Sequence, residues 1–326
     1  MAANLTEKDI EKAYDFAIAI SLKKEFDTMS MMPNFLIIGA AKSGTTALYQ
    51  YLQQHPQIYM SPLKEPQFFA FEGERLNYQG LGVTINQSIT TLERYQTLFQ
   101  NVNGERAIGE ASALYLYIPK ASERIKHYLP KIKLIAILRN PVERAYAAFL
   151  HLMREGREPL NDFGKALAAE PTRIQENWGF LWHYQEMGFY AIQLKRYLDK
   201  FDRSQIRIYL HDDFLKSPLS LIQDIFEFLE VEREFIPDMA FRPNLSGVPQ
   251  NKRLHQFIKE KHWLKHFIKP LLSQKARNRI AERLLQRNLV KPPLSAEIKA
   301  SLTDRFREDI LKLQEILERD LSQWLV

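Results

Sequence analysis

The fold of this chain is decided by the stretch Pro33-Asn34-Phe35-Leu36-Ile37-Ile38-Gly39-Ala40-Ala41-Lys42-Ser43-Gly44-Thr45-Thr46-Ala47-Leu48. Its apolar run from Phe35 to Ile38 predicts a buried parallel strand, after which a short loop leads into a helix from about Thr45. A strand–loop–helix unit of this kind points backbone N–H groups and the positive end of a helix at one place. That place would suit a phosphate or sulfate group, because Lys42 adds a positive charge and the neighbouring hydroxyls add donors.

The spacing within this loop separates it from the Walker A loop of nucleoside triphosphatases. That motif, G-x-x-x-x-G-K-[ST], places its lysine directly after the second glycine. Here Thr45 follows Gly44, and the lysine stands earlier, at Lys42. The pattern therefore indicates an anion-binding loop of another kind. The alternative is a helix N-terminus with ordinary caps and no ligand.

A second candidate anion site follows a later apolar run, Leu134 to Leu138. A nucleoside triphosphatase would place a magnesium-binding Asp near the end of such a strand. This chain places Arg139 there, just before a predicted helix, and an arginine in that position suits a two-pronged contact with phosphate. The alternative is a surface arginine that pairs with Glu143. The sequence thus predicts a site that binds a nucleotide anion through side-chain cations and without a metal.

The middle of the chain alternates between predicted strands and helices. The strands are expected at residues 34–39, 57–60, 106–110, 133–138 and 206–210, and the helices include 45–54, 141–154 and 187–201. Alternation of this kind indicates an α/β fold, here P-loop-like, with helices on both faces of a central parallel sheet in three layers. A helical C-terminal extension is expected to pack on the core through an apolar stripe of Ile298, Leu302, Phe306, Ile310, Leu313, Leu317, Leu321 and Trp324.

These motifs give the chain a family resemblance. The sequences Lys42-Ser43-Gly44-Thr45-Thr46 and Arg139-Asn140-Pro141-Val142-Glu143-Arg144 resemble those of sulfotransferases that use 3′-phosphoadenosine 5′-phosphosulfate (PAPS). The likeness extends over most of residues 33–260. It includes Lys64-Glu65-Pro66-Gln67-Phe68-Phe69, which is similar to the branch of heparan sulfate glucosaminyl sulfotransferases and their bacterial relatives. In that family the first loop grips the 5′-phosphosulfate and the second grips the 3′-phosphate.

The resemblance implies a role for each residue of the site. Glu65 is expected to be the general base, and His255 and His183 are the fallback bases, His255 being counted with the catalytic groups. Lys42 is expected to stabilise charge on the leaving phosphate. The alternative for Glu65 is a surface carboxylate paired with Lys64. The residues expected to hold PAPS are Lys42, Ser43, Gly44, Thr45, Thr46, Arg139, Ser246, Gly247, Lys252 and Arg253. Those expected at the acceptor are Phe69, Glu110, Tyr115 and His183.

The chain departs from the family pattern at two positions. Ala147 stands where many members carry a serine that donates to the 3′-phosphate. The loop from Asn244 to Arg253 is expected to supply a substitute as an anion-closing flap, or else merely to join two helices. Ala111 stands where glycan-acting relatives carry a lysine. Because the cleft lacks that cation, the sequence favours an apolar or neutral hydroxyl acceptor over a heparan-like one.

Composition favours a soluble cytoplasmic enzyme. The chain has 326 residues, of which 45% are hydrophobic, and 20 phenylalanines that can fill a sizeable core. It has no cysteine, so no disulfide framework is possible. Residues 1–32 read as a helix or linker outside the core, without a secretory pattern, and residues 33–326 as the sulfotransferase domain. No run approaches the ~20 apolar residues of a membrane span.

The segment 252–291 is strongly basic, with twelve Lys or Arg against two Glu, in a chain whose net charge is +6. Such a helical segment predicts an anionic partner, an acyl carrier protein being preferred over nucleic acid, whereas ordinary solvated helix faces are the alternative. The resemblance to polyketide synthase sulfotransferase domains implies a β-hydroxyacyl acceptor on that carrier. A glycan or lipid sulfotransferase, and a nucleotide kinase or non-catalytic nucleotide-binding module, are the remaining alternatives.

Overall fold

A five-stranded parallel sheet forms the centre of the molecule. The computed structural model describes residues 32–239, 247–251 and 288–326. The strands run in the order β2-β3-β1-β4-β5, and every neighbouring pair is parallel. Their bounds are Phe35–Gly39 (β1), Ile58–Met60 (β2), Ala107–Ala111 (β3), Lys133–Leu138 (β4) and Ile206–Leu210 (β5). The predicted strands are therefore confirmed, each to within a residue or so of its ends.

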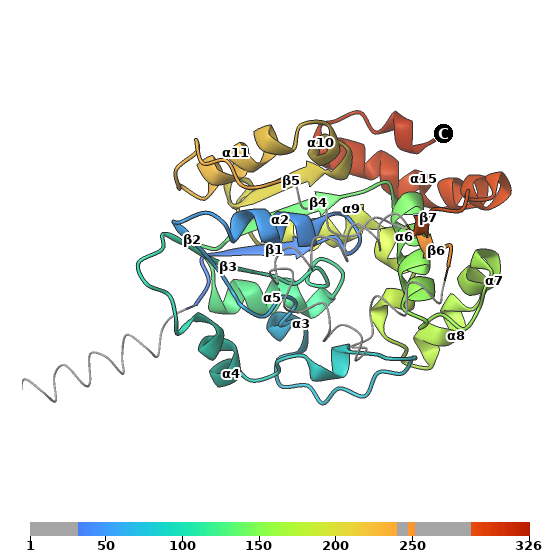
Figure 1. Ribbon diagram of the computed structural model, residues 1–326, viewed down its shortest axis with the longest axis horizontal. Coiled ribbons are helices and arrows are strands. Elements are labelled where there is room, and N and C mark those ends of the chain that lie inside the picture. Colours follow the sequence, from blue (N-terminus) through green and yellow to red (C-terminus); the bar gives the residue numbers. More distant parts are fainter. Residues whose placement is uncertain (1–31, 240–246, 252–287) are drawn as a thin grey trace, which may run out of the picture.

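The two faces of the sheet are covered by different helices (Figure 1). The helices are α2 (Thr45–Leu52), α3 (Phe68–Phe71), α4 (Leu92–Gln96), α5 (Pro119–Tyr128), α6 (Pro141–Arg154), α7 (Phe163–Ala168), α8 (Glu170–Gln175), α9 (Tyr190–Leu198), α10 (His211–Lys216), α11 (Pro218–Phe228) and α15 (Ala296–Leu317). Helices α2, α10 and α11 pack on one face, and α3, α5, α6, α9 and α15 supply the cluster on the other. The predicted three-layer fold is confirmed.

Alternation along each central strand produces these two cores. Phe35 and Ile37 of β1 face α2 and α11, whereas Leu36 and Ile38 face the opposite cluster. Because side chains alternate across a strand and both faces are covered, a buried parallel strand is apolar at every position. This is why the run from Phe35 to Ile38 could be recognised in the sequence.

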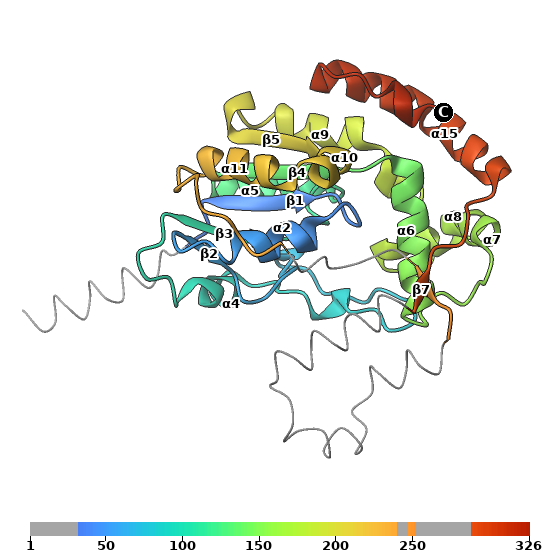
Figure 2. The same ribbon diagram turned by 45° about the horizontal axis from the view of Figure 1, so that its top comes forward.

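The helices that follow β1 and β4 lie on opposite faces of the sheet, and the two strands are neighbours. A crevice forms at such a point, outside the carboxyl ends of the strands, and ligands of α/β proteins bind there. Figure 2 shows the loop after β1 and the start of α6 at this edge. The fold thus brings the two predicted anion sites together.

The C-terminal extension packs on the core as expected. Leu302, Phe306, Ile310 and Leu313 of α15 are buried in the same cluster as α9, and α15 lies along α9 (Figure 1). The helix ends at Leu317, where Glu318 adopts a left-handed conformation with φ of 51°. The stripe continues beyond this end, because Leu321 and Trp324 are buried as well.

A small antiparallel pair was not predicted. Strand β6 (Val248–Pro249) pairs with β7 (Leu289–Val290), so the end of the basic segment is extended and not helical. Most of that segment, and the predicted N-terminal helix, lie outside the described residues. Among the helices that the structure describes, none combines the length and the apolar character needed to cross a bilayer.

Candidate active site

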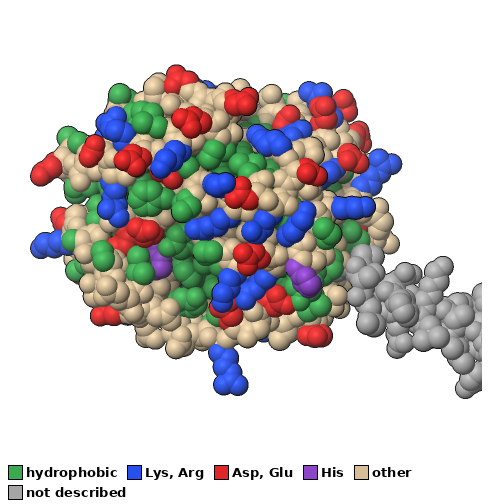
Figure 3. Space-filling view, turned by 180° about the vertical axis from the view of Figure 1, so that it is seen from behind, with side chains coloured by type: hydrophobic (Ala, Val, Ile, Leu, Met, Phe, Trp, Pro, Cys, Tyr) green, Lys and Arg blue, Asp and Glu red, His purple; other side chains and the backbone are tan. Residues whose placement is uncertain are grey.

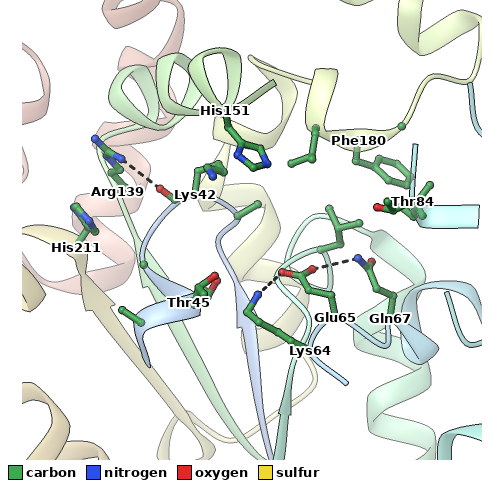
Figure 4. A pocket seen from close by; sticks show the side chains of 18 of the residues that line it. Lys42, Thr45, Lys64, Glu65, Gln67, Thr84, Arg139, His151, Phe180 and His211 are labelled. Atoms are coloured by element: carbon green, nitrogen blue, oxygen red, sulfur yellow. Dashed lines mark hydrogen bonds and ion pairs between the residues drawn. The ribbon is translucent and has the colours of Figure 1, made fainter. Parts of the chain in front are cut away.

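A cavity of about 820 Å³ opens at the carboxyl edge of the sheet. Its wall contains the loop after β1 with Lys42, the segment after β2 with Lys64 and Glu65, and Arg139, which follows β4. Figure 4 shows His211 and Arg139 on one side and Thr84 and Phe180 on the other. Lys42, Lys64, Glu65 and His151 lie between them. The cavity thus has a cationic end, a middle that contains these four side chains, and a second end with a different lining.

The loop after β1 presents backbone donors to the cavity. Lys42 and Gly44 both have positive φ, 67° and 103°, and α2 begins directly after them. This helix has no side-chain cap and no acidic residue in its first turn. The first N–H groups of a helix have no partner within the helix, so an anion placed here would satisfy them.

Lys42 is surrounded by other cations. Burial lowers the pKa of Lys42 to about 7, and the positive charges of Arg154, Lys64 and Arg139 lower it as well, while Glu65 opposes them. A buried ammonium group in such company is destabilised unless an anion joins it. Lys42 and the cations around it therefore fit a phosphate or phosphosulfate group.

Glu65 is held in position by its backbone and by two side chains. Its N–H donates to the carbonyl of Ala111 at 2.9 Å, and its φ of 62° is one that side-chain-bearing residues rarely adopt. One carboxylate oxygen lies 2.7 Å from Lys64 Nζ, and the other accepts a hydrogen bond from Gln67 Nε2 at 3.2 Å (Figure 4). The predicted pairing with Lys64 is present, yet the side chain also faces the cavity.

Gln67 ties this segment to the end of β3. Its φ is 61°, and its backbone N–H donates to Ser112 Oγ at 3.0 Å. Ser112 Oγ in turn donates to the fully buried Glu110 at 2.9 Å. Backbone strain at Lys42, Glu65 and Gln67 is thus concentrated around one cavity, as is common at functional sites.

His151 reaches the cavity from α6, next to Lys42 (Figure 4). Burial and the charges of Lys42 and Arg154 lower its pKa to about 3, so the imidazole is neutral at physiological pH. Its Nδ1 lies 2.9 Å from a guanidinium nitrogen of Arg154. Because arginine can only donate, Nδ1 accepts and the ring proton sits on Nε2. His151 is therefore a hydrogen-bond donor at its free nitrogen.

Arg139 and Lys291 form the cationic end together with a shared carboxylate. Arg139 contacts Glu143 at 3.0 Å, and Lys291 contacts the same oxygen at 2.8 Å. Arg139 also reaches toward the carbonyl of Lys42 at 3.4 Å. The pairing of Arg139 with Glu143 is thus present, while both cations line the cavity. His211 beside them is neutral, because burial and then Arg139 lower its pKa to about 4.

The second end of the cavity is largely apolar. Two segments, 77–83 and 176–182, lie side by side there, joined by Gln79 N–H to the carbonyl of Asn177 at 2.8 Å and by Gly179 N–H to the carbonyl of Gln79 at 2.9 Å. Their side chains and those of neighbouring positions line this end, with Val83, Ile85, Phe180, Leu181 and Trp182 among them. This end would suit the apolar part of an acceptor.

The predicted site residues divide into four groups. Lys42, Gly44, Thr45, Thr46, Glu65 and Arg139 all line the cavity. Ser43, Phe69, Glu110, Tyr115 and His183 are buried and do not line it. Ser246, Lys252, Arg253 and His255 lie outside the described residues. Gly247 is described beside β6 and does not line the cavity.

The residues of the buried group were expected at the donor or the acceptor, and the structure places them inside the protein instead. Phe69 and Tyr115 pack edge to face in the core, with ring centroids 5.6 Å apart, and Glu110 is fully buried in β3. His183 Nε2 donates to the carbonyl of Trp178 at 3.2 Å, and its Nδ1 meets the hydroxyl of Tyr117 at 3.1 Å. Both nitrogens are engaged inside the protein, so His183 is not placed to act as a base in the cavity.

Several polar residues at the cavity were not predicted as site residues, among them Lys64, His151, Arg157, His211 and Lys291. His211 follows β5 as Arg139 follows β4, so the rule that selected Arg139 would have found it. His151 lies one helical turn beyond Ala147, on the same side of α6. Among the residues that the structure describes, no group of three or more His, Cys, Asp or Glu could hold a metal ion.

Comparisons with known proteins identify the family of the chain. The profile of the sulfotransferase family matches residues 33–235. The bifunctional heparan sulfate N-deacetylase/N-sulfotransferase 4 of Mus musculus is 26% identical over 307 residues, which cover 91% of this chain and 32% of that protein. The bifunctional heparan sulfate N-deacetylase/N-sulfotransferase 3 of Homo sapiens is 30% identical over 212 residues, which cover 63% of this chain and 23% of that protein. The chain thus spans about a third or less of the length of these relatives.

A solved structure covers almost the whole chain. The crystal structure of a sulfotransferase from Alicyclobacillus acidocaldarius has 33% sequence identity and a TM-score of 0.71, covering 90% of this chain and 99% of that one. Fold and site together define an α/β protein with a cavity at the carboxyl edge of its sheet, lined by Lys42, Glu65 and Arg139. The chain belongs to the sulfotransferase family. The predicted family and enzyme class are thereby confirmed.

Proposed function

We propose that this protein transfers a sulfuryl group from PAPS to an acceptor hydroxyl, with Glu65 as the general base. The observation that carries the proposal is the meeting of Lys42 and Glu65 across one cavity, between a cationic end and a largely apolar end (Figure 4). PAPS supplies the sulfuryl group, whose bond to the 5′-phosphate oxygen breaks as the acceptor oxygen bonds to sulfur.

The cationic and hydroxyl side chains near the donor then each have one task in the transfer. Backbone N–H groups at the start of α2, with Thr45 and Thr46, hold the 5′-phosphate, and Lys42 neutralises the charge that develops there. Arg139 and Lys291 hold the 3′-phosphate, which competes with Glu143 for them.

Glu65 takes the proton of the acceptor hydroxyl. Gln67 and Lys64 hold the carboxylate in place by contacting one oxygen each. His151, donating from Nε2, stabilises oxygen charge beside Lys42.

The acceptor that we propose is a β-hydroxyacyl chain on an acyl carrier protein, in polyketide or terminal-alkene biosynthesis. The largely apolar end of the cavity supports it, as does Ala111 at the position where glycan-acting relatives carry a lysine. The basic segment 252–291 would meet the acidic carrier. Turnover of a carrier-bound β-hydroxyacyl chain, compared with free sugars and phenols, tests this acceptor. Efficient sulfonation of the sugars or phenols alone would refute it.

Calorimetric titration tests the donor. The bisphosphate product, 3′-phosphoadenosine 5′-phosphate, should bind tightly without metal, and ATP with magnesium should bind weakly. Preference for ATP–magnesium would overturn the proposal in favour of a kinase. Binding of the bisphosphate with no transfer to any hydroxyl would leave a non-catalytic nucleotide-binding module.

The variant Glu65→Gln tests the base. Removing a positioned general base lowers turnover by about 10²–10⁴-fold. We expect that loss in kcat with the affinity for the bisphosphate nearly unchanged, because Glu65 faces the acceptor side. Glu93→Gln, an exposed position on α4, is the matched control. Near wild-type turnover in Glu65→Gln would remove Glu65 from its proposed role.

A further inference from the structure

The largely apolar end of the cavity contains one cation that the transfer chemistry does not use. Arg157 lines this end, and its guanidinium lies 5.2 Å from the ring centre of Trp182. Arg157 Nε donates to the carbonyl of Leu81 at 3.0 Å. Within residues 32–239, 247–251 and 288–326, no carboxylate lies within salt-bridge distance of it, and its two terminal nitrogens have no hydrogen-bond partner. Their donors are available to a ligand.

Helix α6 sets the position of this cation relative to the donor site. Arg139 precedes the helix, His151 lies within it, and Arg157 follows it. The backbone N–H of Arg157 donates to the carbonyl of Leu152 in the last helical turn, at 2.8 Å. Fourteen residues at 1.5 Å each make α6 about 21 Å long. Arg157 therefore cannot contact the phosphate that Arg139 holds, and it belongs to the acceptor end.

The surroundings of Arg157 strengthen its attraction for an anion. Trp182 is fully buried against Gly80 and Gly179, where an added Cβ would lie 2.7 Å and 3.3 Å from its ring. The ring is thus fixed, and the half-buried guanidinium packs against it. Charge attraction and charge-assisted hydrogen bonds are stronger where water is partly excluded.

We propose that the acceptor is an amphiphile with an apolar body, which lies against Val83, Ile85 and Phe180, and a single anionic group, which binds Arg157. This inference rests on the proposed function and narrows its substrate class. One cation in an apolar wall matches one anionic group and does not match the repeated charges of a sulfated or uronic acid polymer. A free hydroxy acid supplies a carboxylate as this anionic group, and the pantetheine arm of a carrier supplies a phosphate. Both are anions that a guanidinium binds.

The experiment measures binding of acceptor probes to the protein already saturated with the bisphosphate product, so that it does not depend on turnover. The probes are 3-hydroxydodecanoate, its neutral methyl ester, 3-hydroxydodecanoyl-phosphopantetheine and a glucosaminyl–glucuronic acid oligosaccharide. We expect the acid or the phosphopantetheine thioester to bind at least about tenfold more tightly than the ester, and whichever of the two binds identifies the source of the anion.

The variant Arg157→Gln should lower the affinity for that anionic probe to the level of the ester, by about tenfold or more, while the ester itself binds unchanged. Arg157→Lys should keep part of the preference, which separates charge from a folding defect. Lys165→Gln removes an exposed cation on α7 and should change nothing.

Two results would overturn the inference: equal binding of acid, thioester and ester to the wild-type protein, or tighter binding of the oligosaccharide. An unchanged preference in Arg157→Gln would do the same. Failure of the bisphosphate itself to bind would sink the proposed function instead, so the two failures are distinguishable.

Discussion

At the scale of single residues, the cluster of cations around Lys42 makes a prediction about proton uptake. In the free protein the pKa of Lys42 is lowered to about 7, first by burial and then by Arg154, Lys64 and Arg139. A bound phosphate reverses this effect, because an adjacent negative charge favours the charged ammonium form. Binding of the bisphosphate above pH 7 must therefore take up a proton, and affinity should fall as pH rises from 7.5 to 9.

Calorimetry in two buffers of different ionisation enthalpy measures this uptake. We expect close to one proton at pH 8.5, where the phosphates of the ligand are already fully ionised. The variant Lys42→Met should bind more weakly and take up none. An uptake that is the same in Lys42→Met and in the wild type would show that another group carries the proton.

The sequence identified those single residues whose neighbours in the chain explain them. Lys42 and Arg139 each follow an apolar run, and the carboxyl ends of parallel strands meet at one edge. Glu65 was identified through the family resemblance of the segment Lys64 to Phe69. Ser43 and Phe69 have the same local setting but point into the core, because tertiary packing and not spacing decides which side of a loop is buried. Lys291 could not be found, since its approach to Glu143 joins positions 148 residues apart.

At the scale of elements, Phe306 makes an aromatic contact between α15 and the core. Phe306 is fully buried, packs against Phe189 with ring centroids 5.1 Å apart, and lies over Gly188, where a Cβ would come within 2.7 Å of its ring. Replacing Phe306 by Ala removes this contact and leaves a cavity. We expect a loss of about 3–5 kcal/mol in unfolding free energy, measured by denaturant titration.

Glu308→Ala changes an exposed position of the same helix and is the control, with an expected change of about 0.5 kcal/mol or less. A loss below about 1 kcal/mol in Phe306→Ala would mean that α15 contributes little to the stability of the core.

Elements with a clear period were predicted well, and those without one were not. Helix α6 was predicted with the bounds that the structure gives it, because Pro141 opens it and its apolar stripe is continuous. Strands β6 and β7 have two residues each, too few for a period of two to be visible. Their pairing depends on contacts across 40 residues and was therefore missed.

At the scale of the whole molecule, the buried Glu110 makes stability depend on pH. Its pKa is raised to about 7, mainly by burial and also by the charge of Glu65, although hydrogen bonds from Tyr115 and Ser112 act in the opposite direction. The folded pKa lies above the unfolded one, so the folded state binds the proton more tightly. The stability contributed by the protonated carboxyl is fully present below about pH 4.5 and is lost as pH rises toward 7.

The variant Glu110→Gln keeps the shape without the ionisation. Its unfolding free energy relative to the wild type should increase between pH 5 and pH 8, as measured by denaturant titration at each pH. A difference that stays constant over this range would show that Glu110 does not titrate in the folded protein near neutral pH.

The order of the strands and the charge of the surface belong to this scale as well. The alternation of strands and helices predicted a parallel sheet, but it could not supply the order β2-β3-β1-β4-β5, because local patterns do not say on which side of β1 each later strand is added. On the face in Figure 3, Lys and Arg side chains are interspersed with Asp and Glu. Most of the segment 252–291 lies outside the described residues, so its anionic partner stays a prediction from the sequence.

Helix α6 also has a consequence for how such an enzyme can be re-engineered. In the proposed function its two ends serve the donor and the acceptor, so inserting or deleting one residue would turn everything beyond it by about 100° around the helix axis. New acceptor ranges should therefore be sought in the paired segments 77–83 and 176–182, from which Val83, Phe180, Leu181 and Trp182 line the largely apolar end of the cavity. A mutational library confined to these segments would change acceptor specificity and leave the residues of the proposed donor site unchanged.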